Sequence, residues 1–172
     1  VQQVEGCKSK TIMGIDPGTN FTGYGIITIR GKEVVSEAIG DIDLVKMADA
    51  YQKLRHIFER VSGIIEAYQP AEVAFESPFY GENVQSMLKL GRAQGVAMAA
   101  ALTRGLPVFE YAPRKIKVAI TGNGAASKEQ VANLLCNQLK IKQIPQNLDS
   151  TDGLAVAMCH YYESTSLTSG AG

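Results

Sequence analysis

The stretch Thr11–Gly25, with the sequence TIMGIDPGTNFTGYG, constrains the fold most, because a short apolar run ends there at a carboxylate. Asp16 ends the run, and a Pro-Gly pair turns the backbone directly after it. A second apolar run, Tyr24 to Ile29, follows, so the stretch predicts a β-hairpin with an acid at its mouth. A buried carboxylate is costly unless it is paired, hydrogen-bonded or metal-bound. Asp16 is therefore either a hydrogen-bonded turn former or a functional ligand.

Apolar spacing predicts three more strands and five helices after this hairpin. A recurrence of apolar residues every three and four positions marks an amphipathic helix over 48–68. The order of the elements predicts an α/β fold, in which a mixed sheet starts with three antiparallel strands and carries helices on its faces. The further strands are expected at 33–39, 71–75 and 107–111, and the further helices at 83–103, 114–121, 128–139 and 149–162.

Two glycines, Gly91 and Gly95, stand inside the expected helix 83–103. Glycine in a helix interior costs about 1 kcal/mol relative to alanine, so the pair indicates a backbone that packs very close to something. Packing against the sheet is the preferred interpretation, and a dimer contact is the alternative.

Composition limits the domain organisation more than the function. The 172 residues suffice for one domain with a substantial core, which we expect over 11–163, with 1–10 a disordered or non-native leader and 164–172 a flexible tail. A net charge of zero identifies no partner. The three cysteines, Cys7, Cys136 and Cys159, lie far apart, which argues against zinc and disulfides and favours the reducing cytoplasm. No apolar run is long enough to span a membrane.

Four acids stand at the ends of expected elements. Asp16 follows the first strand, Glu76 follows the strand 71–75, and Asp149 and Asp152 open the last helix. If the two strands are parallel neighbours, their acids share one crevice, and the i, i+3 pair can close it from the side. Acids in the first turn of a helix also suit its dipole in any protein, so that pair alone is a weak signal. Together, four carboxylates without His or Cys predict Mg²⁺ or Mn²⁺ and phosphoryl-transfer chemistry.

Four blocks of the sequence resemble the RuvC-type Holliday-junction resolvases, the crossover junction endodeoxyribonucleases. The resemblance runs from Ile12 to His160, with the blocks in the order of that family. It implies a ribonuclease H-like fold, with three antiparallel strands followed by two parallel ones. It also implies a nuclease that resolves four-way DNA junctions in recombination and repair by paired symmetric nicks. The blocks are GIDPGTNFTGYGI, FESPFYGENVQSMLKLGRAQG, PVFEYAPRKIKVAITGNGAASKEQV and LDSTDGLAVAMCH.

The resemblance assigns roles to particular residues. It makes the four acids the catalytic ligands of one or two Mg²⁺ ions per subunit, with Mn²⁺ as a substitute. Asp152 stands where some members carry His, which keeps this site all-carboxylate. Phe79 matches the aromatic residue at the junction crossover, with Tyr80 as a second contact, and an ordinary core residue is the alternative for Phe79. Lys117 and Lys128 match basic residues that contact DNA near the cleavage site.

A basic segment gives independent support to the DNA contacts. Between Tyr111 and Lys128 the chain carries four cations and no acid. Such a segment is usually a solvated face, but beside a phosphodiester site it becomes a candidate contact with the DNA backbone. The cations are Arg114, Lys115, Lys117 and Lys128.

The resemblance further implies a homodimer, because two sites related by a twofold axis suit a four-way junction. It also implies work beside the RuvA and RuvB motor proteins. Two other functions compete with this one. One is a junction-binding module that has lost catalysis, and the other is an actin-like enzyme that handles nucleotide phosphates, for which 172 residues leave no second lobe.

Overall fold

The structure is a computed structural model that describes residues 9–78, 83–142 and 148–169, without the side chains of Asp149 and of 167–169. Within these residues, five strands form one mixed sheet in the order β3-β2-β1-β4-β5. β1 pairs antiparallel with β2 and parallel with β4, and β4 pairs parallel with β5, as the sequence predicted. The strands are β1 (Lys10–Asp16), β2 (Phe21–Arg30), β3 (Glu33–Asp43), β4 (Glu72–Glu76) and β5 (Val108–Tyr111).

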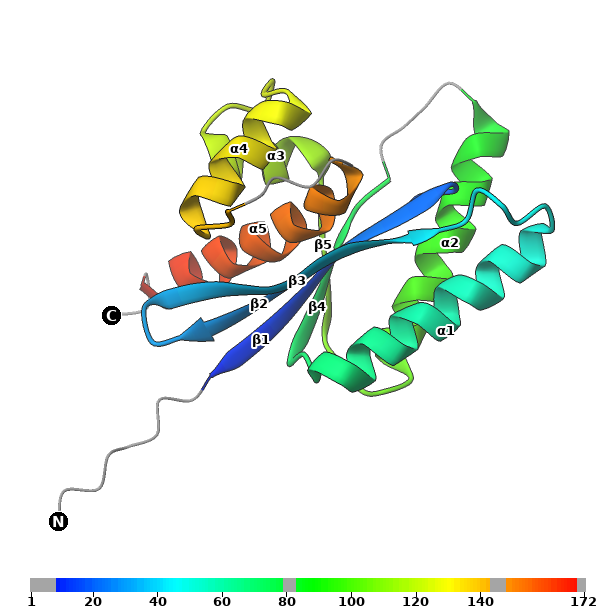
Figure 1. The fold of residues 1–172 in the computed structure, drawn as a ribbon, viewed down its shortest axis with the longest axis horizontal. Helices are drawn as coiled ribbons and strands as arrows, with labels where there is room; N and C mark the ends of the chain where they lie inside the picture. The colour runs from blue at the N-terminus through cyan, green and yellow to red at the C-terminus, as the bar shows by residue number, and fades with distance from the viewer. Residues whose placement is uncertain (1–8, 79–82, 143–147, 170–172) are drawn as a thin grey trace, which may run out of the picture.

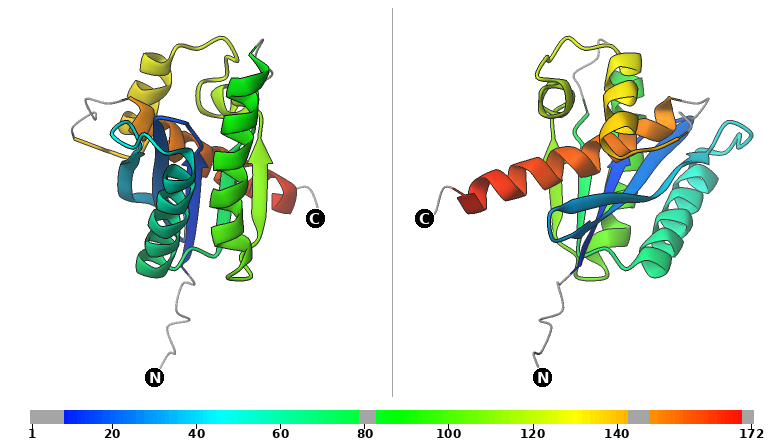
Figure 2. Two further views of the ribbon diagram at one scale, coloured as in Figure 1. Left: turned by 90° about the vertical axis from the view of Figure 1, so that its right-hand side faces the viewer. Right: turned by 60° about the vertical axis from the view of Figure 1, so that its left-hand side comes forward.

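Helices cover both faces of this sheet (Figure 1). Two lie together on one face, and three lie on the other, where the longest runs across the strands (Figure 2). None of the helices in the described ranges combines the length and the apolar character needed to cross a membrane. The helices are α1 (Ala50–Tyr68), α2 (Val84–Leu102), α3 (Pro113–Thr121), α4 (Lys128–Gln138) and α5 (Asp149–Ser169).

The alternation of side chains along β1 produces two separate cores. Met13 and Ile15 are fully buried on the face that α1 and α2 cover. Ile12 points to the opposite face, where Leu135 of α4 and Leu154 of α5 join it. Because successive side chains of a strand alternate between faces, one apolar run serves both layers. This explains why the first strand has no polar residue between Ile12 and Ile15.

Two glycines allow α5 to lie directly on the sheet. Gly14 of β1 and Gly25 of β2 are partners in the strand register. A Cβ at Gly14 would lie 2.1 Å from the carbonyl oxygen of Gly153, and one at Gly25 would lie 2.4 Å from the Cα of Leu154. Any side chain at these positions would push the first turns of α5 away. The glycine pair therefore determines how close the acids of α5 come to the end of β1.

The preferred interpretation of Gly91 and Gly95, close packing against the sheet, was wrong. Both residues are exposed on α2, and a Cβ at either position meets no described atom within 4 Å. The buried face of α2 is instead formed by Ala93, Ala97 and Ala100, whose small side chains let the helix approach the sheet. Close packing thus depends on the alanines, and the glycines face outward.

The last helix is longer than its pattern predicted. α5 continues past Tyr162 to Ser169, so most of the segment expected as a flexible tail from 164 is helical. The apolar pattern fades there because the helix has passed the edge of the sheet and has little left to cover (Figure 2). The buried residues of α5 stop at His160, which marks the end of its packed part.

Candidate functional site

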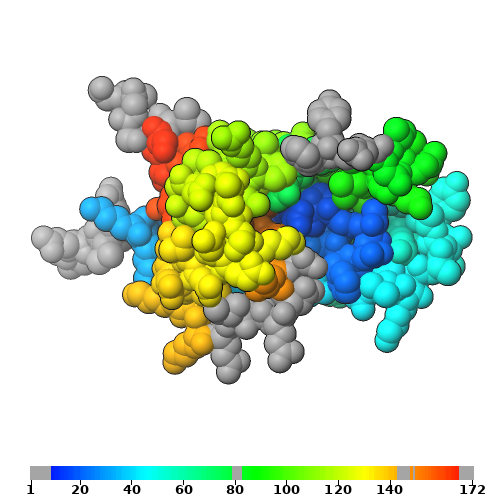
Figure 3. Space-filling model, turned by 90° about the horizontal axis from the view of Figure 1, so that it is seen from above, coloured from blue at the N-terminus to red at the C-terminus, as the bar shows by residue number. Residues whose placement is uncertain are grey.

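The parallel pairing of β1 and β4 brings two acids to the same edge of the sheet. Ile15 and Phe75 are register partners, and Asp16 and Glu76 directly follow them. Viewed from above, the blue surface of the β1–β2 turn lies between yellow atoms of the α3–α4 region and the green and cyan atoms of α2 and α1 (Figure 3). Asp16 and Glu76 line the same two depressions, so the crevice predicted for them exists.

Asp152 joins these acids from the first turns of α5. One hollow is lined by Asp16, Glu76 and Asp152 together with Lys117 and Lys128. Its apolar wall comes from α3, α4 and α5, through Ile116, Val131 and Ala155. Asp149 begins α5, but its side chain lies outside the described residues. The structure thus brings together three of the four predicted acids and two of the predicted cations.

The electrostatics of this hollow centre on Glu76. Burial, reinforced by the negative charges of Asp16 and Asp152, raises the pKa of Glu76 to about 8. Lys128 and Lys117 oppose the shift without cancelling it. A carboxyl group with such a pKa carries a proton at neutral pH, because the buried hollow and its two other acids disfavour the negative charge.

Lys128 occupies a defined position at the mouth of the hollow. It is the first residue of α4, directly after Ser127, whose side chain accepts from the backbone of Gln130 while the Gln130 side chain accepts from Ser127. These two reciprocal bonds form a capping box at the start of α4. The Lys128 ammonium group lies 2.6 Å from a carboxylate oxygen of Asp152. The cap thus places a cation against the acid of another helix.

The described side chains do not form a ready-made metal centre. Among them, no three carboxylates, imidazoles or thiols are gathered closely enough to hold an ion. Mutual repulsion among the acids and the pairing of Asp152 with Lys128 both favour such an open arrangement in the absence of a cation. The groups that surround the hollow are nevertheless oxygen donors of the kind that hard divalent cations prefer.

The other predicted DNA contacts lie elsewhere. The Lys115 ammonium group is 2.7 Å from Glu163 of α5 and 5.5 Å from the ring centroid of Tyr111, so it does not line the hollow. Arg114 is exposed and lies against the backbone of Gly124. Phe79 and Tyr80 lie outside the described residues.

Gln94 is a supporting residue that sequence reasoning missed. It is buried in α2, and its side-chain amide donates to the backbone carbonyl of Glu76 at 3.3 Å and to a carboxylate oxygen of Glu110 at 2.9 Å. These bonds tie α2 to the end of β4 and to β5. A glutamine among the alanines of a buried helix face was the available signal, since a buried amide needs partners.

A second buried network joins the opposite end of β4 to α5. The ring of His160, which is 2% exposed, bridges the Tyr111 hydroxyl at 2.7 Å and Glu72 at 2.6 Å. Lys10 contacts the same Glu72 oxygen at 2.7 Å. Although burial opposes it, bonding to Lys10 and His160 lowers the pKa of Glu72. His160 therefore holds α5 to the sheet.

Comparison with known proteins identifies the family. The family model for the crossover junction endodeoxyribonuclease RuvC matches residues 12–160. The chain belongs to the RuvC family. Its fold is accordingly the ribonuclease H-like fold, as the sequence resemblance implied.

Individual members of the RuvC family match over most of their length. A crossover junction endodeoxyribonuclease RuvC from Christiangramia forsetii is 57% identical over 155 residues, which cover 90% of this chain and 81% of that protein. The RuvC of Bacteroides fragilis is 57% identical over 162 residues, 93% of this chain and 86% of that protein. Among solved structures, Thermus thermophilus RuvC in complex with a Holliday junction substrate matches with a TM-score of 0.81 and 26% identity, covering 91% of this chain and 95% of that one.

Proposed function

We propose that this chain is a structure-selective endonuclease that resolves four-way DNA junctions by paired symmetric nicks. The observation that carries the proposal is the hollow in which acids from three separate elements meet two lysines, in a member of the RuvC family. The solved RuvC bound to a Holliday junction supports the same substrate. The nuclease domain would comprise residues 11–163 and act in the cytoplasm.

The acids of the hollow fit a divalent cation. Asp16, Glu76 and Asp152 offer only oxygen donors, and the raised pKa of Glu76 reflects burial and two neighbouring acids, both of which a bound cation would offset. Asp149 lies one helical turn before Asp152 and would complete the set. We assign one or two Mg²⁺ ions, replaceable by Mn²⁺, to these four residues. A bound ion would supply positive charge opposite the negative charge that develops on the reacting phosphate.

The chain's own residues would bind and orient the scissile strand. Lys117 and Lys128 line the hollow and would contact phosphate oxygens beside the acids. Arg114 and Lys115 lie on the same helix as Lys117 and would extend this contact along the backbone. Phe79 and Tyr80 would stack on bases at the crossover and offset part of the cost of unpairing them.

A homodimer would place two such sites on one junction. The side of α2 that faces away from the core carries Val84 and Leu88, which are 68% and 51% exposed, followed by Gly91 and Gly95. These four residues recur at helical spacing, and we call them the outward stripe of α2. Apolar and small residues in such a row suit close contact with the same row on a second copy. The RuvA and RuvB proteins would be further partners.

Cleavage of a synthetic four-way junction, compared with linear duplex of the same sequence, tests the function. We expect paired nicks in the junction only, and only when Mg²⁺ or Mn²⁺ is present. Binding without nicks under every divalent ion would instead indicate a module that has lost catalysis.

Single substitutions separate catalysis from binding. Asp16→Asn, Glu76→Gln, Asp149→Asn and Asp152→Asn should each abolish cleavage but retain junction binding, because they remove charge and keep size. Glu33→Gln, at the far end of the sheet, is the matched control and should cleave normally. Loss of binding in all four variants would contradict a catalytic role for these acids.

A further inference from the structure

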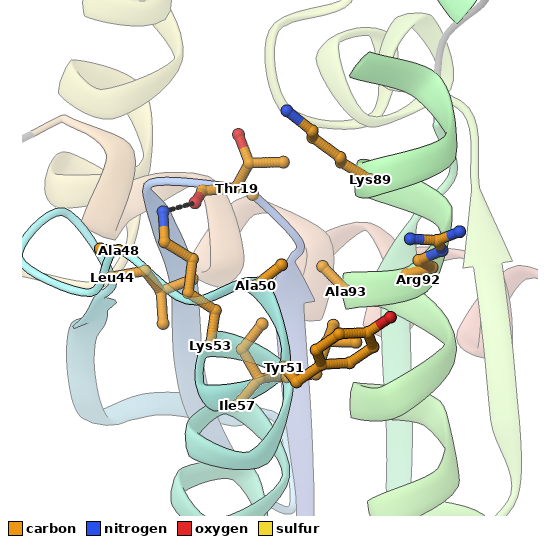
Figure 4. A pocket seen from close by; sticks show the side chains of 12 residues that line it. Thr19, Leu44, Ala48, Ala50, Tyr51, Lys53, Ile57, Lys89, Arg92 and Ala93 are labelled. Atoms are coloured by element: carbon orange, nitrogen blue, oxygen red, sulfur yellow. Dashed lines mark hydrogen bonds between the residues drawn. The ribbon is translucent and has the colours of Figure 1, made fainter. Parts of the chain in front are cut away.

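A second hollow lies between α1 and α2 beside the same end of β1. Its floor is apolar and includes Leu44, Leu54 and Ala93. Three cations stand around it: Lys53 from α1, and Lys89 and Arg92 from α2. Figure 4 shows Lys89 extending from α2 toward the Thr19 side of the hollow and Tyr51 lying across from Arg92. We call this feature the α1–α2 hollow.

The cations of the α1–α2 hollow are not neutralised by neighbouring acids. None of the described residues that line it is acidic. Within the described ranges, none of the ion pairs involves Lys53, Lys89 or Arg92. Lys53 is held instead by donating to the backbone carbonyl of Thr19 at 3.2 Å. In a chain of zero net charge, three such cations around one depression form a local binding site for negative charge.

This hollow lies close to the hollow lined by Asp16, Glu76 and Asp152, which we call the carboxylate site. Gly18 and Thr19, on its rim, follow Asp16 by two and three residues. Another depression is lined by Leu90 together with Asp16 and Glu76, two acids of the carboxylate site. Leu90 sits on α2 between Lys89 and Arg92, so α2 contributes to both depressions. Basic residues therefore stand on both sides of the acids, Lys117 and Lys128 on one side and the α1–α2 hollow on the other.

We propose that the α1–α2 hollow binds the sugar-phosphate backbone of a junction strand that passes the carboxylates, on the side opposite Lys117 and Lys128. Lys89, Arg92 and Lys53 contact phosphates, and the apolar floor lies against the sugars. The proposal rests on the proposed function, since it extends the substrate contact of the same site. A phosphate backbone held at two points across the acids keeps the scissile bond in register with them.

The salt dependence of junction binding tests this contact. A Lys89→Ala/Arg92→Ala double variant should bind the four-way junction more weakly than the wild type. Its log-log slope of affinity against salt should become shallower by about 0.9 for each phosphate that the variant no longer neutralises. Lys32→Ala is the matched control, because Lys32 is an exposed lysine in the β2–β3 turn, at the opposite end of the sheet from Asp16. It should keep the wild-type slope.

Neutral methylphosphonate linkages locate the contact on the DNA. Replacing one phosphate at a time beside the scissile bond should reveal a position that weakens wild-type binding but leaves binding by the double variant unchanged. The same position should still weaken binding by Lys32→Ala. Such a pattern shows that the substituted side chains and that phosphate interact.

Three results would overturn the assignment. In the first, the wild type nicks the junction but the double variant keeps the wild-type slope of affinity against salt. The α1–α2 hollow is then not part of the DNA-binding surface, and the proposed function stands. In the second, the double variant sediments as a monomer whereas the wild type sediments as a dimer. The hollow is then an interface between two copies of the chain. A wild type that binds the junction and never nicks it contradicts the proposed function, whatever the slopes show.

Discussion

Glu76 combines burial with two neighbouring negative charges, and both disfavour its ionised form. Its pKa rises from 4.5 to about 8, with burial as the larger cause and Asp16 and Asp152 as the others. Between these two pH values the folded, metal-free chain keeps a proton that the unfolded chain has lost. Unfolding therefore releases a proton, and the contribution of Glu76 to stability is present at low pH and is lost as the pH rises toward 8.

Glu76→Gln should remove this dependence in the metal-free protein. In thermal melts with EDTA, the Tm of the variant relative to that of the wild type should rise steadily from pH 5 to pH 8. The reason is that glutamine stays neutral over this whole range. Glu33→Gln, on an exposed position of β3, should show no such trend. A difference between Glu76→Gln and wild type that stays constant over this range would contradict the raised pKa.

Gln94 supports the carboxylate site without touching the substrate side of it. Gln94→Met keeps the length of the side chain but removes both donated hydrogen bonds, each of which contributes about 1 kcal/mol. We expect the cleavage rate at saturating junction to fall on the order of tenfold, because the end of β4 loses its tie to α2. Junction affinity should stay near the wild-type value. Gln85→Met, on an exposed position of the same helix, should leave the rate unchanged, and an equal loss in both variants would contradict the positioning role.

Some functional residues could be predicted from the sequence and others could not. The difference is whether the residue's role depends on its neighbours along the chain or on distant segments. Asp16 and Glu76 are marked by their own surroundings, since each ends an apolar run before a proline-containing turn. Gln94 and Gly14 derive their roles from segments far away in the chain, and nothing beside them reveals which segment covers them. Phe79 is a third case, because its role comes from the family resemblance alone.

At the scale of elements, the position of α5 depends on the glycine pair beneath it. Gly14→Ala would place a Cβ 2.1 Å from the Gly153 carbonyl oxygen and 2.4 Å from the backbone nitrogen of Ala157. Backbone atoms cannot yield as a flexible side chain can, so we expect a loss of about 3 kcal/mol, which lowers the Tm by roughly 6–12 °C. Cleavage should fall with it, because Asp152 moves with α5.

Gly63→Ala is the matched control for Gly14→Ala. Gly63 lies in the interior of α1, and a Cβ there meets no described atom within 4 Å. Alanine should therefore stabilise the helix by about 0.5–1 kcal/mol. A Gly14→Ala variant that also gains stability would mean that α5 does not rest on the backbone of β1 as described.

The type and order of the elements followed from the sequence more reliably than their ends. Apolar runs and helical spacing marked every strand and helix in the described ranges, because each of these elements buries apolar side chains. β3, expected to end at Ile39, continues to Asp43 because it pairs with β2 as far as Phe21. That partner is distant along the chain, so the local pattern could not show where pairing stops.

At the scale of the whole molecule, the two layers of helices contribute different residues to the surface around the acids. The face with α3, α4 and α5 supplies Lys117, Lys128 and Asp152 to the carboxylate site. The face with α1 and α2 supplies Lys53, Lys89 and Arg92, and the outward stripe of α2. The end of β1 lies between them (Figure 3). A strand crossing this end would meet cations, then acids, then cations.

The proposed dimer, formed through the outward stripe of α2, would determine whether two nicks are paired. Leu88→Glu places a charge in the middle of this stripe, which a second copy would have to bury without a partner. We expect the variant to sediment at half the mass of the wild type. Leu134→Glu, a comparable exposed leucine on α4, should remain a dimer.

Cleavage of a plasmid that extrudes a cruciform gives a different DNA product for a dimer and for a monomer. Two symmetric cuts within one encounter linearise such a plasmid, whereas a single cut leaves a nicked circle. Wild type and Leu134→Glu should yield linear DNA, and Leu88→Glu should yield mainly nicked circles, because a monomer presents one carboxylate site at a time. Linear product from a Leu88→Glu variant that still sediments as a dimer would place the interface on another surface. The two readouts together therefore distinguish a lost interface from a damaged site, which would yield neither product.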